Sequence, residues 1–325
     1  MAAINLLNIQ PHQVSRDLSG YITFIYGAPK TGKTTLATQM KGSLLLAFER
    51  GYNALPGVIA QDITSWSEFR QVYRELKKPE VKANFNAVIL DTIDIAADMC
   101  QKYICNQKDI ESLGDLGYGK GWTAFKEEFN EVIRGLTQLG YAVFFIGHHK
   151  EVTVTDPDGT ERIVIRPSLS NSTRTVVEGM ADIYGYAHQS RTSEMSVLTL
   201  RSPDDSISCG GRFKYLPNEI PLSYNNLVSA LSEAIEKEAA ENGGQFVTNE
   251  KLKVTTLEKE YDYDEMMKTV NDLINQLMAL NQSNAVKITA TIEKYLGKGR
   301  KVADCTPTQC EQLELIILDL NDLLG

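Results

Sequence analysis

The chain has 325 residues and a mass of 36.2 kDa, with 42% hydrophobic and 23% charged residues, a composition that excludes wholesale disorder. No stretch approaches the roughly 18 uninterrupted apolar residues of a membrane span, and the opening MAAINLLNIQPHQ lacks the regions of a signal peptide, so we expect a cytoplasmic protein without a membrane partner. The net charge of −9 excludes a surface coated with DNA-binding cations, and any nucleic-acid contact must be local.

Short apolar runs alternate with amphipathic stretches from Tyr21 to about Ala239, which is the pattern of an α/β domain. Most of the apolar runs are nearly continuous, as expected for parallel strands that helices cover on both faces. The predicted strands are Tyr21–Tyr26, Ser43–Phe48, Ala87–Leu90, Tyr141–Ile146, Asp182–Ala187 and Ser196–Leu200. The predicted helices among them are Lys33–Met40, Ser67–Leu76 and Lys126–Leu139.

A protruding hairpin is predicted after the fourth strand. Thr153–Thr155 and Arg162–Ile165 flank the pentapeptide DPDGT, whose composition favours an exposed turn. Farther on, the glycines and polar residues of ENGGQ, at 241–245, break the pattern and indicate a linker. We therefore predict a core over residues 1–240, a linker over 241–262 and a small helical domain over 263–325.

Three short helices are predicted in this last domain, at about Tyr263–Leu280, Asn284–Leu296 and Pro307–Leu324. The third begins with a capping box, in which Thr306 is the cap and Gln309 the third helical residue. Its apolar stripe must be buried, either in a small bundle or against a partner protein. The stripe consists of Leu313, Ile316, Ile317 and Leu320.

The cysteines and histidines give no sign of a disulfide framework or a structural metal. The five cysteines include no CxxC pair, and the four histidines show no HExxH or other ligand spacing. We expect reduced thiols.

The most specific motif is G-x-x-x-x-G-K-[ST], which residues 27–34 match as GAPKTGKT between an apolar strand and a helix. Its glycines let backbone N–H groups turn toward phosphate oxygens. Lys33 is expected to reach the β- and γ-phosphates, and the Thr34 hydroxyl to ligate Mg²⁺. The sequence thus predicts ATP and Mg²⁺ as cofactors, and the predicted binding residues are Gly27, Ala28, Pro29, Lys30, Thr31, Gly32, Lys33, Thr34 and Thr35.

Two acidic residues at strand ends are candidates for holding the metal and orienting water. Asp91 follows the strand Ala87–Leu90, where a P-loop ATPase needs a carboxylate for magnesium, although an aspartate there also suits a helix N-cap. Glu49 ends the strand Ser43–Phe48, where a carboxylate can orient the attacking water. The alternative for Glu49 is a solvated charge beside Arg50.

The order of these motifs resembles the RecA-like core: the P-loop, then Glu49 in LLLAFERG, then Asp91-Thr92, then a strand ending in His148. The stretch LGDLGYGKGWTAFKEEFNEVIRGLTQLGYAVFFIGHHK is similar to phage-encoded RecA-like nucleotide-binding proteins, including core-only single-strand-annealing recombinases of the Sak group. The similarity covers about Tyr21 to Ala239. It implies a mostly parallel central sheet flanked by helices, and the host cytoplasm as location.

Carried over residue by residue, the resemblance implies that Glu49 activates water and Asp91 coordinates magnesium. It also implies that His148 is the polar sensor that links the γ-phosphate to the following loop. RecA has a glutamine at this place, so the histidine is a departure that makes proton-dependent behaviour conceivable. The alternative is that His148 and His149 are strand-end histidines bonded to the backbone.

Two segments occupy the positions of DNA-binding loops in RecA-like proteins. The first is the glycine-rich stretch 113–122, which offers flexibility and close backbone approach, with side chains for stacking and charge. The second, 150–180, holds the hairpin, and its acidic residues offset its cations. The candidate DNA-binding residues are Tyr118, Lys120, Trp122, Lys150, Arg162, Arg166 and Arg174.

The segment GGRFK, at 210–214, resembles the region where RecA-like ATPases and replicative helicases place a finger for a neighbouring subunit. Arg212, or else Lys214, would then stabilise charge on the γ-phosphate in trans. The alternative is a hairpin turn with solvated cations. A shared site of this kind implies a homo-oligomer, either a ring or a filament.

Two functions follow from these patterns. The first is an ATP-hydrolysing protein that assembles on single-stranded DNA in phage-type recombination or annealing. Its candidate partners include a single-stranded-DNA-binding protein or another replication or recombination protein. The second is an ATP-switched scaffold or regulator that binds a protein partner through the C-terminal helices, favoured by the acidic net charge and the amphipathic segment Glu311–Leu324. A helicase motor is weaker, because no further motif implies strand separation.

Overall fold

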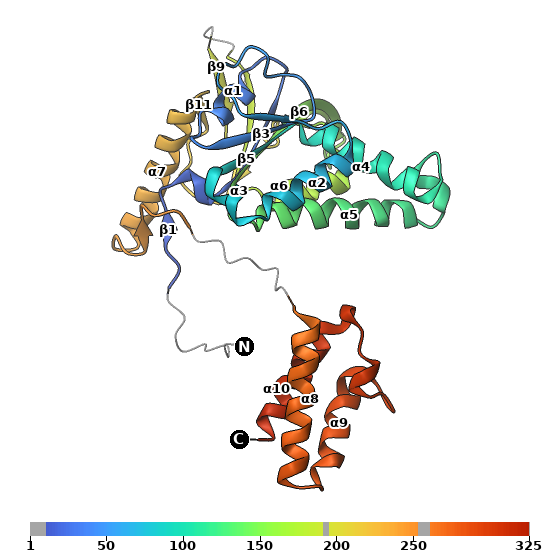
Figure 1. Ribbon diagram of the computed structural model, residues 1–325. Coiled ribbons are helices and arrows are strands. Elements are labelled where there is room, and N and C mark those ends of the chain that lie inside the picture. Colours follow the sequence, from blue (N-terminus) through green and yellow to red (C-terminus); the bar gives the residue numbers. More distant parts are fainter. Residues whose placement is uncertain (1–10, 191–194, 253–260, 325) are drawn as a thin grey trace. The chain divides into compact units, whose positions relative to one another are not determined.

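The chain divides into two units, which we call the core unit (residues 1–257) and the helical unit (residues 258–325). The computed structural model, drawn in Figure 1, describes residues 11–190, 195–252 and 261–324. All strands of the described residues lie in the core unit, whereas the described part of the helical unit contains helices alone.

A large sheet forms the centre of the core unit. Its strands are β2 (Ile22–Gly27), β3 (Ser43–Ala47), β4 (Ala60–Asp62), β5 (Ala87–Asp91), β6 (Ala142–Thr155), β7 (Glu161–Pro167), β8 (Ile183–Gln189), β9 (Ser196–Thr199), β10 (Gly210–Gly211) and β11 (Glu219–Pro221). The order across the sheet is β11-β9-β8-β2-β6-β5-β3-β4, and the strands from β8 to β4 run parallel. The prediction of a mostly parallel central sheet is therefore confirmed.

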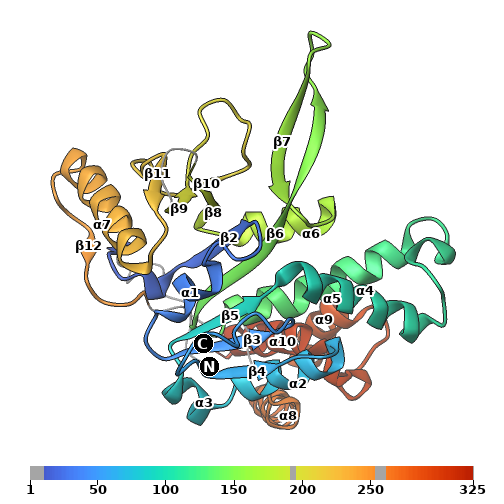
Figure 2. The same ribbon diagram turned by 90° about the horizontal axis from the view of Figure 1, so that it is seen from above.

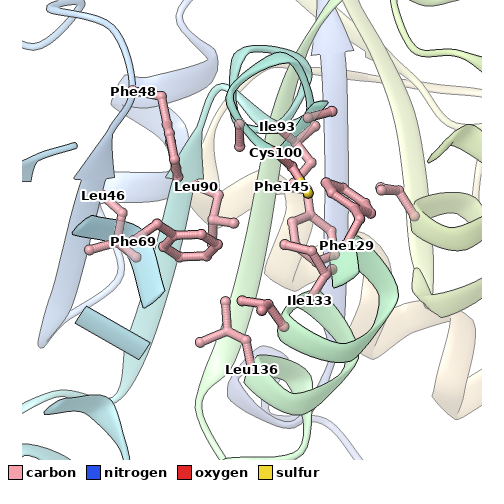
Figure 3. Packing of buried hydrophobic residues seen from close by; sticks show 14 of the residues in the cluster. Leu46, Phe48, Phe69, Leu90, Ile93, Cys100, Phe129, Ile133, Leu136 and Phe145 are labelled. Carbon is pink, nitrogen blue, oxygen red and sulfur yellow. The ribbon is translucent and has the colours of Figure 1, made fainter. Parts of the chain in front are cut away.

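Helices cover both faces of this sheet. They are α1 (Lys33–Thr38), α2 (Trp66–Leu76), α3 (Pro79–Asn84), α4 (Ile93–Lys108), α5 (Lys120–Thr137), α6 (Asn171–Met180) and α7 (Tyr224–Glu241). Successive strand residues point to opposite faces. Leu46 therefore belongs to the cluster that contains Phe69 of α2 and Phe129 of α5 (Figure 3), whereas Leu45 belongs to the cluster that contains α1 and α7 residues. The P-loop strand β2 thus lies inside a sheet that is buried on both faces.

All six predicted strands are present, and their bounds differ from the prediction by one or two residues except in β6, which continues to Thr155. Four helices of the core unit were not predicted: α3, α4, α6 and α7. Small residues such as Ala96, Ala97 and Cys100 form much of the buried face of α4, and such residues give a weak apolar periodicity.

The predicted hairpin is confirmed and forms an arm that extends away from the sheet (Figure 2). The outer part of β6 pairs antiparallel with β7, from His149 opposite Pro167 to Thr155 opposite Glu161. Gly159 has a φ of 86° in the connecting turn, a conformation that glycine adopts without strain. The same strand therefore lies in the central sheet and in the arm.

The predicted linker over 241–262 begins too early. Its residues Val247–Thr248 form strand β12, which pairs in parallel with β1 (Val14–Ser15) of the core unit. The Ser15 hydroxyl also donates a hydrogen bond of 2.6 Å to the carbonyl of Glu250. Backbone pairing therefore holds this segment to the core, and the later part, 253–260, lies outside the described residues.

The helical unit contains α8 (Tyr263–Leu280), α9 (Asn284–Leu296) and α10 (Cys310–Asp322), with short 3-10 turns at Val302–Asp304 and Pro307–Gln309. The predicted bounds of the first two helices are confirmed, and the Thr306 backbone N–H donates to the Gln309 side chain as the capping box requires. The predicted stripe on α10 is buried in a cluster with α8 and α9, as a small bundle requires. Among the described residues, none of the helices is long and apolar enough to cross a membrane.

Candidate nucleotide site

The register of the parallel strands brings the candidate residues to one edge of the sheet. Gly27 at the end of β2 lies opposite His148 of β6, and Asp91 at the end of β5 lies opposite Ile146 of β6 and Ala47 of β3. Ligands bind outside the carboxyl ends of strands in open α/β sheets. The structure therefore assembles residues from four strands at the edge where a ligand is expected.

The loop between β2 and α1 depends on its two glycines. A Cβ on Gly27 would lie 2.0 Å from the carbonyl oxygen of Ala187 in β8, so no larger residue fits. Gly32 has a φ of +98° where the chain enters α1, which favours glycine. The Thr31 hydroxyl donates to the Ala28 carbonyl. Pro29 and Lys30 of the loop and Thr35 of α1 are exposed.

The side chain of Lys33 is folded against this loop. Lys33 is only 6% exposed, and its Nζ donates hydrogen bonds to the carbonyls of Gly27 (3.2 Å) and Ala28 (2.7 Å). Burial lowers the pKa of Lys33, and the charges of Asp91 and Glu49 oppose that shift. The ammonium group is thus held where the loop amides would receive a polyphosphate.

Thr34 and Asp91 meet beside the loop. The Thr34 hydroxyl donates a hydrogen bond of 2.6 Å to Oδ2 of Asp91, and Asp91 is 3% exposed. Burial raises the pKa of Asp91 to about 6, although the bond from Thr34 opposes the shift. A hydroxyl and a carboxylate are the hard oxygen donors that Mg²⁺ prefers, and a nearby cation favours the charged carboxylate. The donor set therefore fits the predicted magnesium.

Glu49 lies beside Asp91 because the chain after β3 is bonded to the end of β5. The backbone N–H groups of Phe48 and Glu49 both donate to the carbonyl of Asp91, at 2.8 and 3.3 Å. The carboxylate of Glu49 is partly exposed, and its Oε1 lies 3.7 Å from Nε2 of His148. The two residues that the sequence leads us to expect as water activator and sensor are therefore neighbours.

A third acidic residue, Asp94, completes this group, and the sequence did not predict it. Asp94 lies in the first turn of α4, and its Oδ2 is 2.7 Å from Nδ1 of His148. The backbone N–H of His148 also donates to Oδ1 of Asp94, at 3.4 Å. The imidazole thus lies between two carboxylates, Asp94 and Glu49, and its ring contacts side chains rather than the backbone groups of our alternative.

The glycine-rich stretch expected to be a loop is partly helical. Leu113–Leu116 forms a 3-10 turn, and α5 begins at Lys120. A Cβ on Gly121 would lie 2.1 Å from the Leu113 carbonyl oxygen, so this glycine allows close packing rather than flexibility. Tyr118 is fully exposed in the short connection, and Trp122 is 47% exposed on the first turn of α5. The C-terminal end of α4 and the start of α5 project from the core (Figure 2).

Most of the candidate cations near the arm bind their own chain. Arg162 donates to both carboxylate oxygens of Asp156 at 3.0 Å, and the Lys150 ammonium donates to the Leu169 carbonyl. Arg174 lies 3.8 Å from the carboxylate of Glu178. Arg166 lies opposite Lys150 in the hairpin register. A DNA contact through Arg162 or Arg174 therefore competes with an existing ion pair.

Arg212 lies at the opposite edge of the sheet from the loop. It follows Gly211, which pairs with Ile183 at the start of β8, whereas Gly27 pairs with Ala187 four residues later, a separation of about 13 Å at roughly 3.3 Å per residue. Its Nε is 3.2 Å from the carboxylate of Asp182. Arg212 therefore does not reach the nucleotide site of its own chain. Lys214 is paired with Glu241.

The fold and this site define a P-loop nucleotide-binding domain. A family model described as an AAA domain matches residues 19–212, which is more than half of the chain, and the chain belongs to this family of P-loop ATPases. The chain is also 32% identical over 335 residues to the SPbeta prophage-derived uncharacterized protein YorG of Bacillus subtilis (strain 168). That similarity covers 99% of this chain and 99% of the relative.

Proposed function

We propose that the protein is a Mg²⁺-dependent ATPase that acts on single-stranded DNA in phage-type recombination or annealing. The observation that carries the proposal is the meeting of Lys33, Asp91, Glu49 and His148 at one edge of the sheet, where strand β6 continues into the arm. The AAA-domain match and the similarity to a prophage protein support the nucleotide chemistry and the phage context.

Each of these residues has a distinct part in hydrolysis. The ammonium of Lys33 and the loop amides bind the phosphates, while Thr34 and Asp91 hold Mg²⁺. The metal, when bound, neutralises charge on the phosphate oxygens. Glu49 accepts a proton from, or orients, the attacking water. His148 orients the same water or the γ-phosphate, with its ring fixed by Asp94 at 2.7 Å.

The connection from this site to DNA runs through strand β6. His148 lies inside the site, and the same strand continues as one half of the arm. The Ser168 N–H donates to the His148 carbonyl at 2.8 Å. The hydroxyl of Tyr26, next to the P-loop, lies 2.8 Å from the Ser208 carbonyl and 3.2 Å from the Ile165 carbonyl. A displacement of His148 by nucleotide would therefore move the base of the arm.

Fluorescence anisotropy with labelled single-stranded oligonucleotides tests the proposal. The protein should bind more tightly with a non-hydrolysable ATP analogue and Mg²⁺ than without nucleotide. Lys33→Ala protein is the matched control, because it should lose the nucleotide effect and keep the fold. Absence of binding at low salt in both states would reject a role on single-stranded DNA while leaving the ATPase assignment intact.

Arg212 enters this proposal as a residue acting on a neighbouring subunit. Because Arg212 does not reach the nucleotide site of its own chain, a direct part in hydrolysis would be in trans, and it would require Arg212 to leave Asp182. A homo-oligomer, either a ring or a filament, would supply the neighbour. Negative-stain microscopy with ATP analogue and single-stranded DNA distinguishes these assemblies from a monomer.

A second candidate function is an ATP-switched scaffold that binds a protein through the helical unit. Leu315 and Leu318 are 43% and 45% exposed on α10, one turn apart and therefore on one side of the helix. Removing residues 258–325 separates the two functions. Retained DNA binding with loss of a protein partner would support the scaffold, whereas loss of DNA binding would contradict it.

A further inference from the structure

The cations of the helical unit are segregated in one stretch of sequence. Of the six lysines and arginines in residues 261–324, five lie between 287 and 301, where Glu293 is the only acidic residue. The remainder of this range has one cation, Lys268, and nine acidic residues. We call the five residues the basic stripe: Lys287, Lys294, Lys298, Arg300 and Lys301.

The geometry of α9 places two residues of the stripe on one side of the helix. Lys287 and Lys294 are seven residues apart, which is close to two helical turns and about 10 Å along the axis, so both lie on the same side of α9. Lys298, Arg300 and Lys301 follow in the loop after the helix. Figure 1 shows this helix beside α8 and α10, with the following loop at the far end from the α8–α9 turn.

The loop holds its cations in an ordered backbone. Gly297 and Gly299 have φ values of 102° and 79°, in the left-handed region that glycine adopts without strain. The Gly299 N–H donates a hydrogen bond of 2.7 Å to the carboxylate of Glu293. The loop sequence GKGRK, at 297–301, contains no apolar side chain. The loop is thus built to present charge rather than to pack.

The loop cations are available to a ligand. Lys298, Arg300 and Lys301 are exposed, and within the described residues their side chains take part in no ion pair. Lys294 is the exception, because its Nζ is 2.8 Å from Asp319 and lies 4.6 Å from the centre of the Tyr295 ring. These three neighbouring cations form no ion pair, although residues 261–324 include ten acidic residues. The loop is therefore suited to bind an anionic partner.

We propose that the basic stripe binds the phosphate backbone of single-stranded DNA. Phosphates are recognised by point cations and by the bidentate guanidinium of arginine, and they require little apolar contact. A protein interface instead has an apolar or aromatic centre, which the GKGRK loop lacks. The proposal rests on the action on single-stranded DNA proposed above and assigns part of that binding to the helical unit, which the sequence had linked only to a protein partner.

The test compares two triple variants of the full chain. The stripe variant is Lys298→Ala with Arg300→Ala and Lys301→Ala, and the control is Lys82→Ala with Lys237→Ala and Lys268→Ala, which removes the same charge elsewhere. Anisotropy with labelled oligothymidine, titrated over a range of salt, gives the affinity and its salt slope. Each lost phosphate contact lowers the slope for a single strand by about 0.7, so the stripe variant should lose about 2 from its slope.

The stripe variant should also bind at least about tenfold more weakly at low salt, while its thermal unfolding and its ATP hydrolysis without DNA match the wild type. A stripe variant that binds like the control overturns the inference. If it binds DNA normally and only its self-association falls, measured by light scattering, the stripe binds the acidic surface of a second copy and the inference is equally wrong. Absence of wild-type binding would instead reject the role on single-stranded DNA.

Discussion

Replacing Asp94 with alanine is the sharpest test of the proposed catalytic roles of Glu49 and His148. The Asp94 carboxylate is mostly buried, with 14% of its side chain exposed, and it holds Nδ1 of His148 at 2.7 Å. Nε2 of the same ring faces Glu49 at 3.7 Å. Among the described residues, no hydrogen bond or ion pair joins Asp94 to Lys33 or Thr34. We therefore expect Asp94 to act as a positioning residue for His148.

The size of the effect follows from the bond that is lost. A hydrogen bond to a charged group contributes about 1.5–3 kcal/mol, and each 1.36 kcal/mol of barrier is tenfold in rate. If the ring must be fixed only in the transition state, Asp94→Ala should lower kcat by roughly 10- to 150-fold. Asp94→Asn keeps an acceptor without the charge and should have a smaller effect.

Single-turnover kinetics measure the rate of ATP hydrolysis, and calorimetry measures nucleotide affinity. Nucleotide affinity should change little, because Lys33 and the loop are intact. The double variant Asp94→Ala with His148→Ala should be no slower than His148→Ala alone, since Asp94 acts through that ring. Additive losses in the double variant, or a turnover of Asp94→Ala close to wild type, would refute the positioning role.

Three further predictions concern neighbouring residues. Glu49→Gln should bind ATP normally and hydrolyse it about 10²-fold more slowly, measured by phosphate release. Burial raises the pKa of Asp91 from 3.8 to about 6. The free energy of unfolding of the magnesium-free protein, measured with urea, should therefore be highest below pH 4 and fall by about 3 kcal/mol as the pH rises through 6. Arg212→Ala should depress turnover only in assembled protein, and mixing it with Lys33→Ala protein should restore some activity.

Each of these predictions has its own control. Normal turnover of Glu49→Gln protein would remove the carboxylate from the site. An Asp91→Asn variant cannot titrate, so a stability decline between pH 4 and 6 equal to that of wild type would show that another group causes it. Equal loss of turnover by Arg212→Ala in dilute and assembled protein would point to its ion pair with Asp182 as a purely structural contact.

The sequence was informative wherever the physical signal is local. Apolar runs located the strands, and acidic residues at two strand ends identified Glu49 and Asp91 as candidates. Asp94 was missed because its significance depends on His148, 54 residues farther along the chain. A carboxylate one turn after Asp91 has no distinguishing local pattern, and only the pairing of β5 with β6 brings it to the imidazole.

Other differences between expectation and structure have equally specific causes. The glycines at 117–121 suggested flexibility, but Gly121 is required by the close approach of the Leu113 carbonyl, which sequence alone cannot reveal. The distance of Arg212 from the P-loop follows from the pairing of Gly211 with Ile183, the first residue of β8, and the sequence alone does not reveal this pairing. The start of the linker was misplaced because a strand of only two residues, Val247–Thr248, is too short to give a periodic signal.

The pairing of β1 with β12 joins the two ends of the core unit's described chain. Val14 lies opposite Val247, and the Val14 N–H donates to the Phe246 carbonyl at 2.8 Å. Adjacent termini are the condition under which a domain tolerates circular permutation. A circular permutant of the core could therefore join its present ends and have new termini in the turn at Asp158-Gly159. The chain would then be interrupted at the tip of the arm, while every strand that carries the nucleotide site would stay intact.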